Sequence, residues 1–310
     1  MPAPIHLGLV GVGRWGRNYV RTIAEVDGAE LAAVASSNPD TREIVPPGCG
    51  IFADWRDLLN ENIDAVIIAS PPSTHAEILI AAVAAGKAVL VEKPLVTTAA
   101  DLAAIQSAVT NSIVMVEHTH LFHPAFRALK GMVVAKGKPR GIRASAGNTG
   151  PYRKDISVLW DWGPHDVAMA LDLVPGPAKV CEARVVERRY VGDVAAERVK
   201  LKLGLAGCVP CDVTLSTLDP RHRWLAVDYA DSTLIYSDRQ GHALRFVGAP
   251  GAGLEAEGEV IDVPDARPLT VAVQEFVDAV RQQIPMTANI IQANQVVDVI
   301  LRCGQGLSYD

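Results

Sequence analysis

Short apolar runs alternate with amphipathic stretches through residues 1–120. Apolar runs of about four to eight residues are typical of strands buried on both faces. The runs that predict strands are Ile5–Val10, Glu30–Ser36, Ala65–Ser70, Ala88–Glu92 and Ile113–Glu117. Because strands that alternate with helices form parallel sheets, we predict a doubly wound parallel α/β domain over residues 1–120, with its ligand at the carboxyl ends of the strands.

The pattern changes after Pro124, where strand-like segments follow one another with short turns between them. These segments are Val180–Arg188, Arg198–Leu205, Val209–Leu215, Trp224–Tyr229 and Thr233–Tyr236. The expected helices are Ala125–Ala135, Pro164–Val174, Thr270–Gln283 and Ile290–Cys303. Successive strands joined by short links favour antiparallel pairing. We therefore predict a C-terminal α+β domain over residues 121–310 with a large, mostly antiparallel open sheet.

A G-x-G-x-x-G motif at residues 11–16 directly follows the first predicted strand. In a strand–turn–helix unit, Gly11 permits the tight turn, Gly13 lets the backbone approach a pyrophosphate, and Gly16 lets the helix pack close to the strand. The phosphates are expected at the start of the helix, in a site that includes Arg14 and Trp15. Trp15 is expected either to rest over the cofactor or to pack the first helix. The motif predicts a Rossmann dinucleotide-binding domain.

The end of the second predicted strand bears on the choice of cofactor. Rossmann domains that prefer NAD place an acidic residue there, which binds the ribose 2′-hydroxyl. This chain has Ser36, Ser37 and Asn38 instead, and its first acidic residue is Asp40. A 2′-phosphate would meet no repulsion, and Ser36, Ser37 or Arg42 could bind it. We therefore expect NADP or NAD, with a slight preference for NADP.

Composition excludes several classes of protein. The chain has 310 residues, of which 49% are hydrophobic and 21% are charged, and its formal net charge is −6. No apolar run is long enough to span a bilayer, and no signal-peptide pattern precedes the first strand. A negative chain without a Lys/Arg block is not typical of nucleic-acid binding. We expect a cytoplasmic protein that binds neither membrane nor nucleic acid.

Two sets of residues have spacings that suggest metal ligands. Cys208 and Cys211 form a C-x-x-C motif, but it lies in an apolar strand run without two further ligands, so buried strand cysteines are expected. The histidines His118, His120 and His123 have no carboxylate or thiolate neighbours in the sequence, which favours packing or substrate contact. The five cysteines are an odd number, which argues against a disulfide scaffold. No metal site is expected.

Four strings in the chain carry a family resemblance. They are Gly11–Gly16, Ser70–His75, Glu92–Pro94 and Asp161–Asp166. In this order and spacing they resemble the glucose–fructose oxidoreductase / inositol dehydrogenase (Gfo/Idh/MocA) family, from residue 5 to about residue 175. The resemblance implies an NAD(P)-dependent oxidoreductase that transfers a hydride between the nicotinamide and a hydroxyl or carbonyl carbon of a sugar or cyclitol.

The resemblance implies three catalytic residues: Lys93, Asp161 and His165. Lys93 ends a buried strand where the cofactor is expected, so its ammonium could stabilise a developing alkoxide. His165 is expected in the first turn of a helix beside Pro164, where the dipole would keep the imidazole neutral and available as a base. Asp161, just ahead of that turn, could orient the imidazole, bind a substrate hydroxyl or cap the helix. Lys93 and His165 both remain candidates for the proton acceptor.

Other residues of these strings have less specific roles. His75 is expected either to line the nicotinamide side or to cap the helix that follows it. Arg153 and Lys154 could hold an anionic part of the substrate or form a solvated pair, and Asp166 is the expected helix-capping acid. The remaining residues of the expected cofactor site are Ser70, Pro71, Glu92 and Lys93.

The strings at His118–Phe126, Val158–Asp161 and Pro164–Asp166 resemble the branch that oxidises nucleotide-linked sugar acids at the sugar 3-position. The family resemblance also implies a homodimer or homotetramer formed through the open face of the second sheet, since apolar strand residues there would need cover. Two alternatives are a reductase or dehydrogenase of another small carbonyl or diol, and a non-catalytic binding protein that senses dinucleotides. The presence of Lys93, Asp161 and His165 together argues against a sensor, which needs only the dinucleotide.

Overall fold

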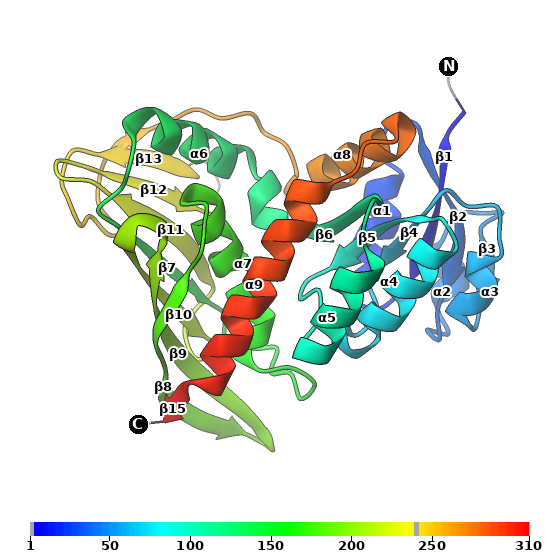
Figure 1. Cartoon of the computed structure of the whole chain (residues 1–310), viewed down its shortest axis with the longest axis horizontal. Helices are drawn as coiled ribbons and strands as arrows, with labels where there is room; N and C mark the ends of the chain where they lie inside the picture. Colours follow the sequence, from blue (N-terminus) through cyan, green and yellow to red (C-terminus); the bar gives the residue numbers. More distant parts are fainter. Residues whose placement is uncertain (1–2, 239–241, 310) are drawn as a thin grey trace. The chain divides into compact units, whose positions relative to one another are not determined.

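The computed structural model describes residues 3–238 and 242–309, which form two compact units. The first unit comprises Met1–Thr119 and Arg267–Val297, and the second comprises His120–Ala266 and Asp298–Asp310. Each unit is built around one β-sheet (Figure 1). The chain therefore returns to the first unit after it has built most of the second.

The first unit contains a six-stranded parallel sheet with the order β3-β2-β1-β4-β5-β6. The strands are β1 (Ile5–Val10), β2 (Ala29–Ala35), β3 (Gly50–Phe52), β4 (Ala65–Ile68), β5 (Ala88–Glu92) and β6 (Val114–Glu117). Every residue of β4, β5 and β6 is buried, as the continuous apolar runs predicted. The strand order reverses between β1 and β4, and ligands bind such sheets at the carboxyl ends beside this switch point. The predicted Rossmann sheet is confirmed.

Helices of the first unit cover this sheet, and two of them, α3 and α5, begin with a side-chain cap. They are α1 (Gly16–Ile23), α2 (Thr41–Ile44), α3 (Trp55–Leu59), α4 (His75–Ala84), α5 (Ala99–Ala108), α8 (Pro268–Gln282) and the first part of α9 (Thr287–Gln305). At the start of α5, the Thr98 hydroxyl accepts a hydrogen bond from the backbone N–H of Asp101 at 3.1 Å. That hydroxyl also donates to the Asp101 carboxylate at 2.7 Å, so two groups at the helix start are satisfied together.

The second unit contains a nine-stranded sheet with the order β14-β13-β12-β11-β7-β10-β9-β8-β15. The strands are β7 (Gly141–Gly147), β8 (Lys179–Val191), β9 (Val194–Leu205), β10 (Val209–Ser216), β11 (His222–Asp228), β12 (Thr233–Ser237), β13 (Leu244–Val247), β14 (Glu259–Val260) and β15 (Leu307–Tyr309). Pairing is antiparallel except between β10 and β7 and between β15 and β8. The predicted large, mostly antiparallel sheet is confirmed.

The two faces of the second sheet differ in chemistry. One face packs against α6 (Pro124–Lys136) and α7 (Val158–Leu173), and it receives alternate buried residues such as Leu201 and Val213. On the other face, the intervening positions include the exposed Lys200, Lys202 and Asp212. At β9 and β10 the second face is therefore charged and not apolar as expected, because its side of the period-two pattern carries lysine and aspartate there.

The Gly248–Gly258 stretch covers a small apolar patch on that charged face. Ala226, Ile235 and Val247 form a buried cluster against which Ala252 and Ala256 pack. Arginine side chains hold the stretch in place, since Arg143 donates to the Ala252 carbonyl at 2.7 Å and Arg245 to the Ala256 carbonyl at 2.5 Å. This loop has a packing role that its composition did not reveal.

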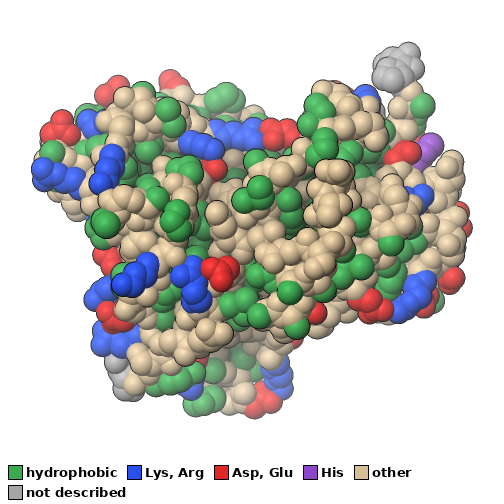
Figure 2. Space-filling model, viewed as in Figure 1, with side chains coloured by type: hydrophobic (Ala, Val, Ile, Leu, Met, Phe, Trp, Pro, Cys, Tyr) green, Lys and Arg blue, Asp and Glu red, His purple; other side chains and the backbone are tan. Residues whose placement is uncertain are grey.

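Charge on the molecular surface is mixed. Figure 2 shows Lys and Arg side chains interspersed with Asp and Glu side chains on the face drawn. Among the described residues, no helix is long and apolar enough to cross a membrane.

Candidate active site

The glycine turn between β1 and α1 needs its three glycines for different reasons. Gly11 has a φ of 95°, and a Cβ added there would lie 2.8 Å from the carbonyl oxygen of Ala69. A Cβ on Gly16 would lie 1.9 Å from the carbonyl oxygen of Gly11. A Cβ on Gly13 would meet no protein atom within 4 Å. Gly11 and Gly16 thus serve the fold, whereas Gly13 leaves open space of the kind that a pyrophosphate requires.

A buried carboxylate joins this turn to the end of β5. Glu92 is 6% exposed and accepts hydrogen bonds from the Trp15 indole N–H and, at 2.6 Å, from the Tyr19 hydroxyl. Trp15 is 44% exposed, so only its N–H edge is held, and the neighbouring Arg14 is exposed. Burial raises the pKa of Glu92, while the bond from Tyr19 and the nearby ammonium of Lys93 lower it. The last residue of β5 therefore holds the start of α1 beside the switch point.

Lys93 follows Glu92 at the carboxyl edge of the sheet, and its side chain is half-buried. The adjacent strand β6 ends in Glu117, which pairs in register with Glu92. Glu117 is fully buried, and burial together with the charge of Glu92 raises its pKa to about 8. Its neighbour His118 is also buried, which lowers the pKa of that imidazole to about 3. The edge at which Lys93 emerges thus contains two buried carboxyl groups.

His75 has a different role from the two that the sequence suggested. Its ring is fully buried and lies 3.0 Å from the Pro94 carbonyl at Nδ1 and 3.0 Å from the Ser70 carbonyl at Nε2. The residue that precedes α4 is Thr74, whose side chain makes no capping bond. His75 is therefore neither a helix cap nor an exposed ring. It connects the loop after β4, including the exposed Pro71, to the residue that follows Lys93.

The end of β2 presents hydroxyl groups rather than a carboxylate. Ser36 accepts hydrogen bonds from the backbone of Asn38 at 3.1 Å and from the Thr41 hydroxyl at 3.0 Å. Ser37 and Arg42 are exposed. The Asn38 amide donates to the Val12 carbonyl at 2.9 Å, which fixes this loop against the glycine turn. Of the three predicted phosphate-binding residues, Ser37 and Arg42 face solvent, and Ser36 maintains the loop.

In the second unit, α7 begins at Val158 rather than at Pro164. Asp161 lies in its first turn, Pro164 lies inside the helix, and His165 lies beyond the first turn. The prediction that the helix begins at Pro164 is wrong. Proline is common in the first turn of a helix, but here the residues before it, from Val158 onward, are already helical. The argument that the helix dipole keeps His165 neutral therefore no longer holds, since that effect is confined to the first turn.

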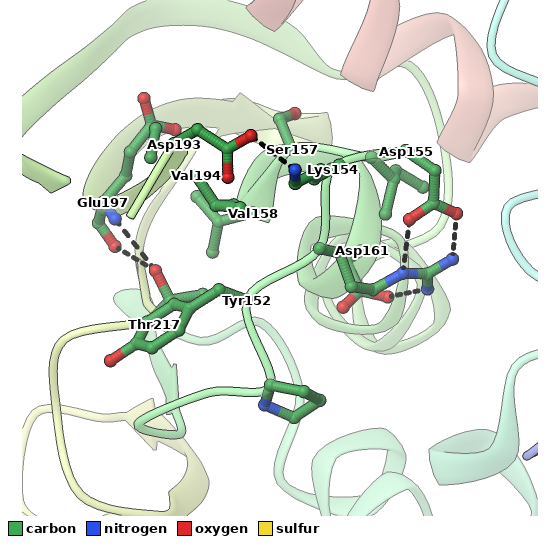
Figure 3. Close-up of a pocket in the computed structure, with 14 residues that line it drawn as sticks. Tyr152, Lys154, Asp155, Ser157, Val158, Asp161, Asp193, Val194, Glu197 and Thr217 are labelled. Atoms are coloured by element: carbon green, nitrogen blue, oxygen red, sulfur yellow. Dashed lines mark hydrogen bonds and ion pairs between the residues drawn. The ribbon is translucent and has the colours of Figure 1, made fainter. Parts of the chain in front are cut away.

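A cavity of about 410 Å³ lies beside Asp161 within the second unit. Figure 3 shows Asp161 and Asp155 on the same guanidinium group, that of Arg153, which is 3.1 Å from Asp161 and 2.6 Å from Asp155. Lys154, which also lines the cavity, pairs with Asp193. Tyr152, Ser157, Glu197 and Thr217 complete the polar part of the lining. Arg153 and Lys154 are thus paired with acids at the rim of a cavity of a size that suits a sugar.

His165 rests on a second histidine. The ring of His120 meets it edge-on, with the centroids 5.1 Å apart, and the Nδ1 atom of His120 lies 2.8 Å from the Tyr236 hydroxyl. Asp166 is fully buried and pairs with Arg223 at 2.7 Å, so the expectation that Asp166 caps a helix is wrong. The reason is that Asp166 lies in the middle of α7 and faces the sheet, where only an ion pair offsets its burial.

The remaining histidine and cysteine predictions concern metals. His123 caps α6, since its Nδ1 accepts the backbone N–H of Ala125 at 3.1 Å. Cys211 is buried in β10, whereas Cys208 is exposed, so the expectation of a buried strand cysteine is wrong for Cys208. Within residues 3–238 and 242–309, no cluster of three or more His, Cys, Asp or Glu side chains could hold a metal ion.

Comparisons with known proteins identify the family. A family model described as an oxidoreductase family with an NAD-binding Rossmann fold matches residues 5–120. A crystal structure from Magnetospirillum magnetotacticum MS-1, provisionally described as an oxidoreductase, is 41% identical and superposes with a TM-score of 0.88 over 96% of this chain and 99% of its own. The chain belongs to the glucose–fructose oxidoreductase / inositol dehydrogenase family.

Two curated relatives of this family are sugar or cyclitol dehydrogenases. The UDP-N-acetylglucosamine 3-dehydrogenase of Acidithiobacillus ferrooxidans is 28% identical over 96% of both chains. Inositol 2-dehydrogenase 1 of Saccharopolyspora erythraea is 36% identical over 135 residues, which are 41% of this chain and 40% of the relative. The expectation of an NAD(P)-dependent dehydrogenase or reductase of this family is confirmed.

Several residues that shape this family member's site were missed in the sequence. Tyr19 and Asn38 hold the glycine turn from outside the motif. His120, for which the sequence favoured packing or substrate contact, packs on His165, a partner that the sequence did not indicate. A signal for Glu117 was present, because β5 and β6 both end in an apolar run followed by glutamate. When two adjacent parallel strands end at paired positions, the side chains of their last residues lie at the same edge of the sheet.

Substitution of the glycines tests whether the turn Gly11–Gly16, called the cofactor seat below, binds the dinucleotide. Gly13→Ala is expected to change the free energy of unfolding by less than about 0.5 kcal/mol, because the new methyl group meets no protein atom. Dinucleotide binding, measured by fluorescence titration, should weaken at least about tenfold, because the methyl group fills the space that the phosphates need.

Gly16→Ala should instead destabilise the fold by about 2 kcal/mol or more, because its Cβ overlaps the Gly11 carbonyl. The matched control is Gly131→Ala, at an exposed helical position with open space, which should alter neither property unfavourably. Unchanged dinucleotide affinity in Gly13→Ala would show that the seat is assigned wrongly.

Proposed function

We propose that this protein is an NADP-dependent dehydrogenase that oxidises the 3-hydroxyl of a nucleotide-linked sugar and also catalyses the reverse reduction. One observation carries the proposal. Trp15 in the glycine turn and Tyr19 in α1 both donate hydrogen bonds to Glu92, and Glu92 directly precedes Lys93 in the chain. It ties the cofactor seat to a lysine at the sheet edge where a nicotinamide would bind. The relative that matches nearly the whole chain acts on a UDP-linked sugar at position 3, which supports the choice of substrate.

The residues of the first unit fit a dinucleotide. The open space at Gly13 suits a pyrophosphate, and the first N–H groups of α1 have no side-chain cap. When bound, the nicotinamide supplies the hydride acceptor or donor. Lys93 is proposed to hydrogen-bond the reacting oxygen and to stabilise its charge as the C–H bond breaks or forms. Ser70, Pro71 and His75 shape the loop next to this lysine.

Asp161 and His165 are proposed to complete the chemistry from α7. Asp161 lies at the sugar-sized cavity, where its carboxylate can accept a hydrogen bond from a substrate hydroxyl. His165 is proposed, as an alternative to Lys93, as the group that accepts the hydroxyl proton. Its ring is steadied by His120, which Tyr236 holds in turn.

We further propose a cytoplasmic enzyme that forms a homodimer or homotetramer through the open face of the second sheet. Exposed Lys200 and Lys202 on β9 and exposed Asp212 on β10 give that face both signs of charge, so two copies can pair there by complementary contacts. The molar mass in solution tests this proposal, and a monomer at working concentration would contradict it.

Isotope transfer tests the proposed reaction. UDP-N-acetylglucosamine deuterated at C3 is incubated with NADP, and the reduced cofactor is analysed by mass spectrometry. We expect deuterium on the nicotinamide ring, because the C3–H bond is the one that breaks. Deuterium that stays on the sugar, with no NADPH formed, would contradict the proposed substrate.

Replacement of Ser36 tests the proposed preference for NADP. Ser36→Asp keeps an acceptor for the Asn38 backbone and the Thr41 hydroxyl but adds a negative charge at the end of β2. The dissociation constant of NADP should rise at least about tenfold through repulsion of the 2′-phosphate. That of NAD should stay the same or fall, because the carboxylate can bind the 2′-hydroxyl.

The matched control for this variant is Ser36→Asn, which is similar in shape to Ser36→Asp but uncharged. Its ratio of the NADP and NAD dissociation constants should be closer to that of the parent than the ratio of Ser36→Asp is. Tighter binding of NAD than of NADP by the parent protein would contradict the preference.

A further inference from the structure

Two carboxyl groups meet at the sheet edge beside Lys93. Glu92 and Glu117 are register partners on the adjacent parallel strands β5 and β6, and their exposed fractions are 6% and 0%. Neighbouring strands in a sheet lie about 4.8 Å apart, so neither carboxyl group can move away from the other without leaving the core. Glu92 supports the glycine turn through Trp15 and Tyr19, whereas Glu117 makes no such contact.

The hydrogen bonds of the two carboxyl groups are unequal. Glu92 accepts from both Trp15 and Tyr19, which stabilises its ionised form. Glu117 accepts at its Oε2 atom from the Thr119 hydroxyl at 2.5 Å. Its buried Oε1 atom has no hydrogen-bond partner among the described residues. A buried carboxylate oxygen without a donor is costly, whereas a protonated one is much less so.

Among the titratable groups that face the two carboxyl groups, only Lys93 carries a positive charge that can offset theirs. Burial lowers the pKa of His118 to about 3, so that side chain is neutral at physiological pH. Burial and the charge of Glu92 raise the pKa of Tyr19, so that side chain is neutral as well. Two ionised carboxylates would therefore outnumber the single ammonium of Lys93, whereas one ionised carboxylate matches it. Like charges held together in a buried site retain one proton between them.

We propose that the Glu92–Glu117 pair holds one exchangeable proton beside Lys93, with Glu117 as its carrier, and that Glu117 is a positioning residue for this lysine. Glu92 stays ionised and faces the ammonium, and Glu117 stays neutral so that the lysine is matched by one negative charge. Loss of that proton doubles the negative charge beside Lys93, which holds the ammonium more strongly at the carboxyl pair and weakens its interaction with the reacting oxygen. The inference rests on the proposed role of Lys93.

The stability of the protein reports on the stored proton independently of catalysis. Glu117 binds its proton more tightly in the folded state than in the unfolded chain. The folded state therefore carries more protons between about pH 5 and pH 8, and the free energy of unfolding falls as the pH rises through this interval. Glu117→Gln has nearly the shape of the protonated acid and cannot ionise. We expect this variant to lack that component of the decline, so that its stability relative to the parent increases from pH 5 to pH 8.

The pH dependence of turnover reports on the coupling to Lys93. The parent is expected to show an inflection near pH 8 in kcat, and Glu117→Gln should lose it. Thr119→Val keeps the carboxyl group but removes a hydrogen bond that favours its ionised form, so the inflection should move to higher pH. Glu61→Gln, an identical change at an exposed position of the same unit, is the control and should retain the profile of the parent.

Each arm of the experiment decides one part of the proposal. Parallel stability curves for the parent and Glu117→Gln would overturn the stored proton. A stability difference combined with unchanged pH profiles in Glu117→Gln and Thr119→Val would overturn the coupling to Lys93. If Glu117→Gln does not fold, Thr119→Val decides alone, and an unmoved inflection overturns the proposal. Failure of the proposed reaction would appear instead as an absence of deuterium transfer in the parent, with the stability difference intact.

Discussion

The structure of the cofactor seat depends on the burial of the Glu92 carboxylate at the end of β5. A carboxylate removed from water is costly unless donors surround it, and Trp15 and Tyr19 supply two from the turn before α1 and from α1 itself. The same residue precedes Lys93, so one set of hydrogen bonds fixes both the glycine turn and the backbone from which the lysine extends. Loss of the Glu92 hydrogen bonds would therefore disturb both the glycine turn and the position of Lys93.

His75 supports the same arrangement from the opposite side. Its two ring nitrogens lie beside the carbonyls of Ser70 and Pro94, so it ties the loop after β4 to the residue after Lys93. Three segments that are distant in the sequence are thereby held at one edge of a parallel sheet. The chemistry of this family member is built on positions at which strands end, as the reversal of strand order between β1 and β4 requires.

Much of the first sheet was predictable because each buried parallel strand appears as a continuous apolar run, and the glycine turn has a fixed spacing. Contacts across sequence distance were not. The return of Arg267–Val297 to the first unit leaves no periodic signal, and the hydrogen bonds of Glu92 join residues more than seventy positions apart. Pro164 misled the prediction of α7, because a proline inside a helix resembles one at its start in sequence.

The cavity of the second unit is lined by acids and bases that already pair with one another. A substrate at the proposed site would have to exchange these contacts for its own. The paired Arg153 and Asp161 could not be foreseen as partners, since a loop of irregular structure separates them. The cofactor class follows from the first unit, whereas a fold alone does not determine a substrate.

Lys93 is proposed to act on the reacting oxygen and not merely to hold the fold. Turnover and NADP affinity measured side by side for Lys93→Met test it most directly, with Lys179→Met at an exposed position as the matched control. We expect Lys93→Met to lose turnover by about a hundredfold or more while the dissociation constant of NADP stays within about threefold of the parent. Normal turnover in Lys93→Met would show that the lysine has no part in the reaction.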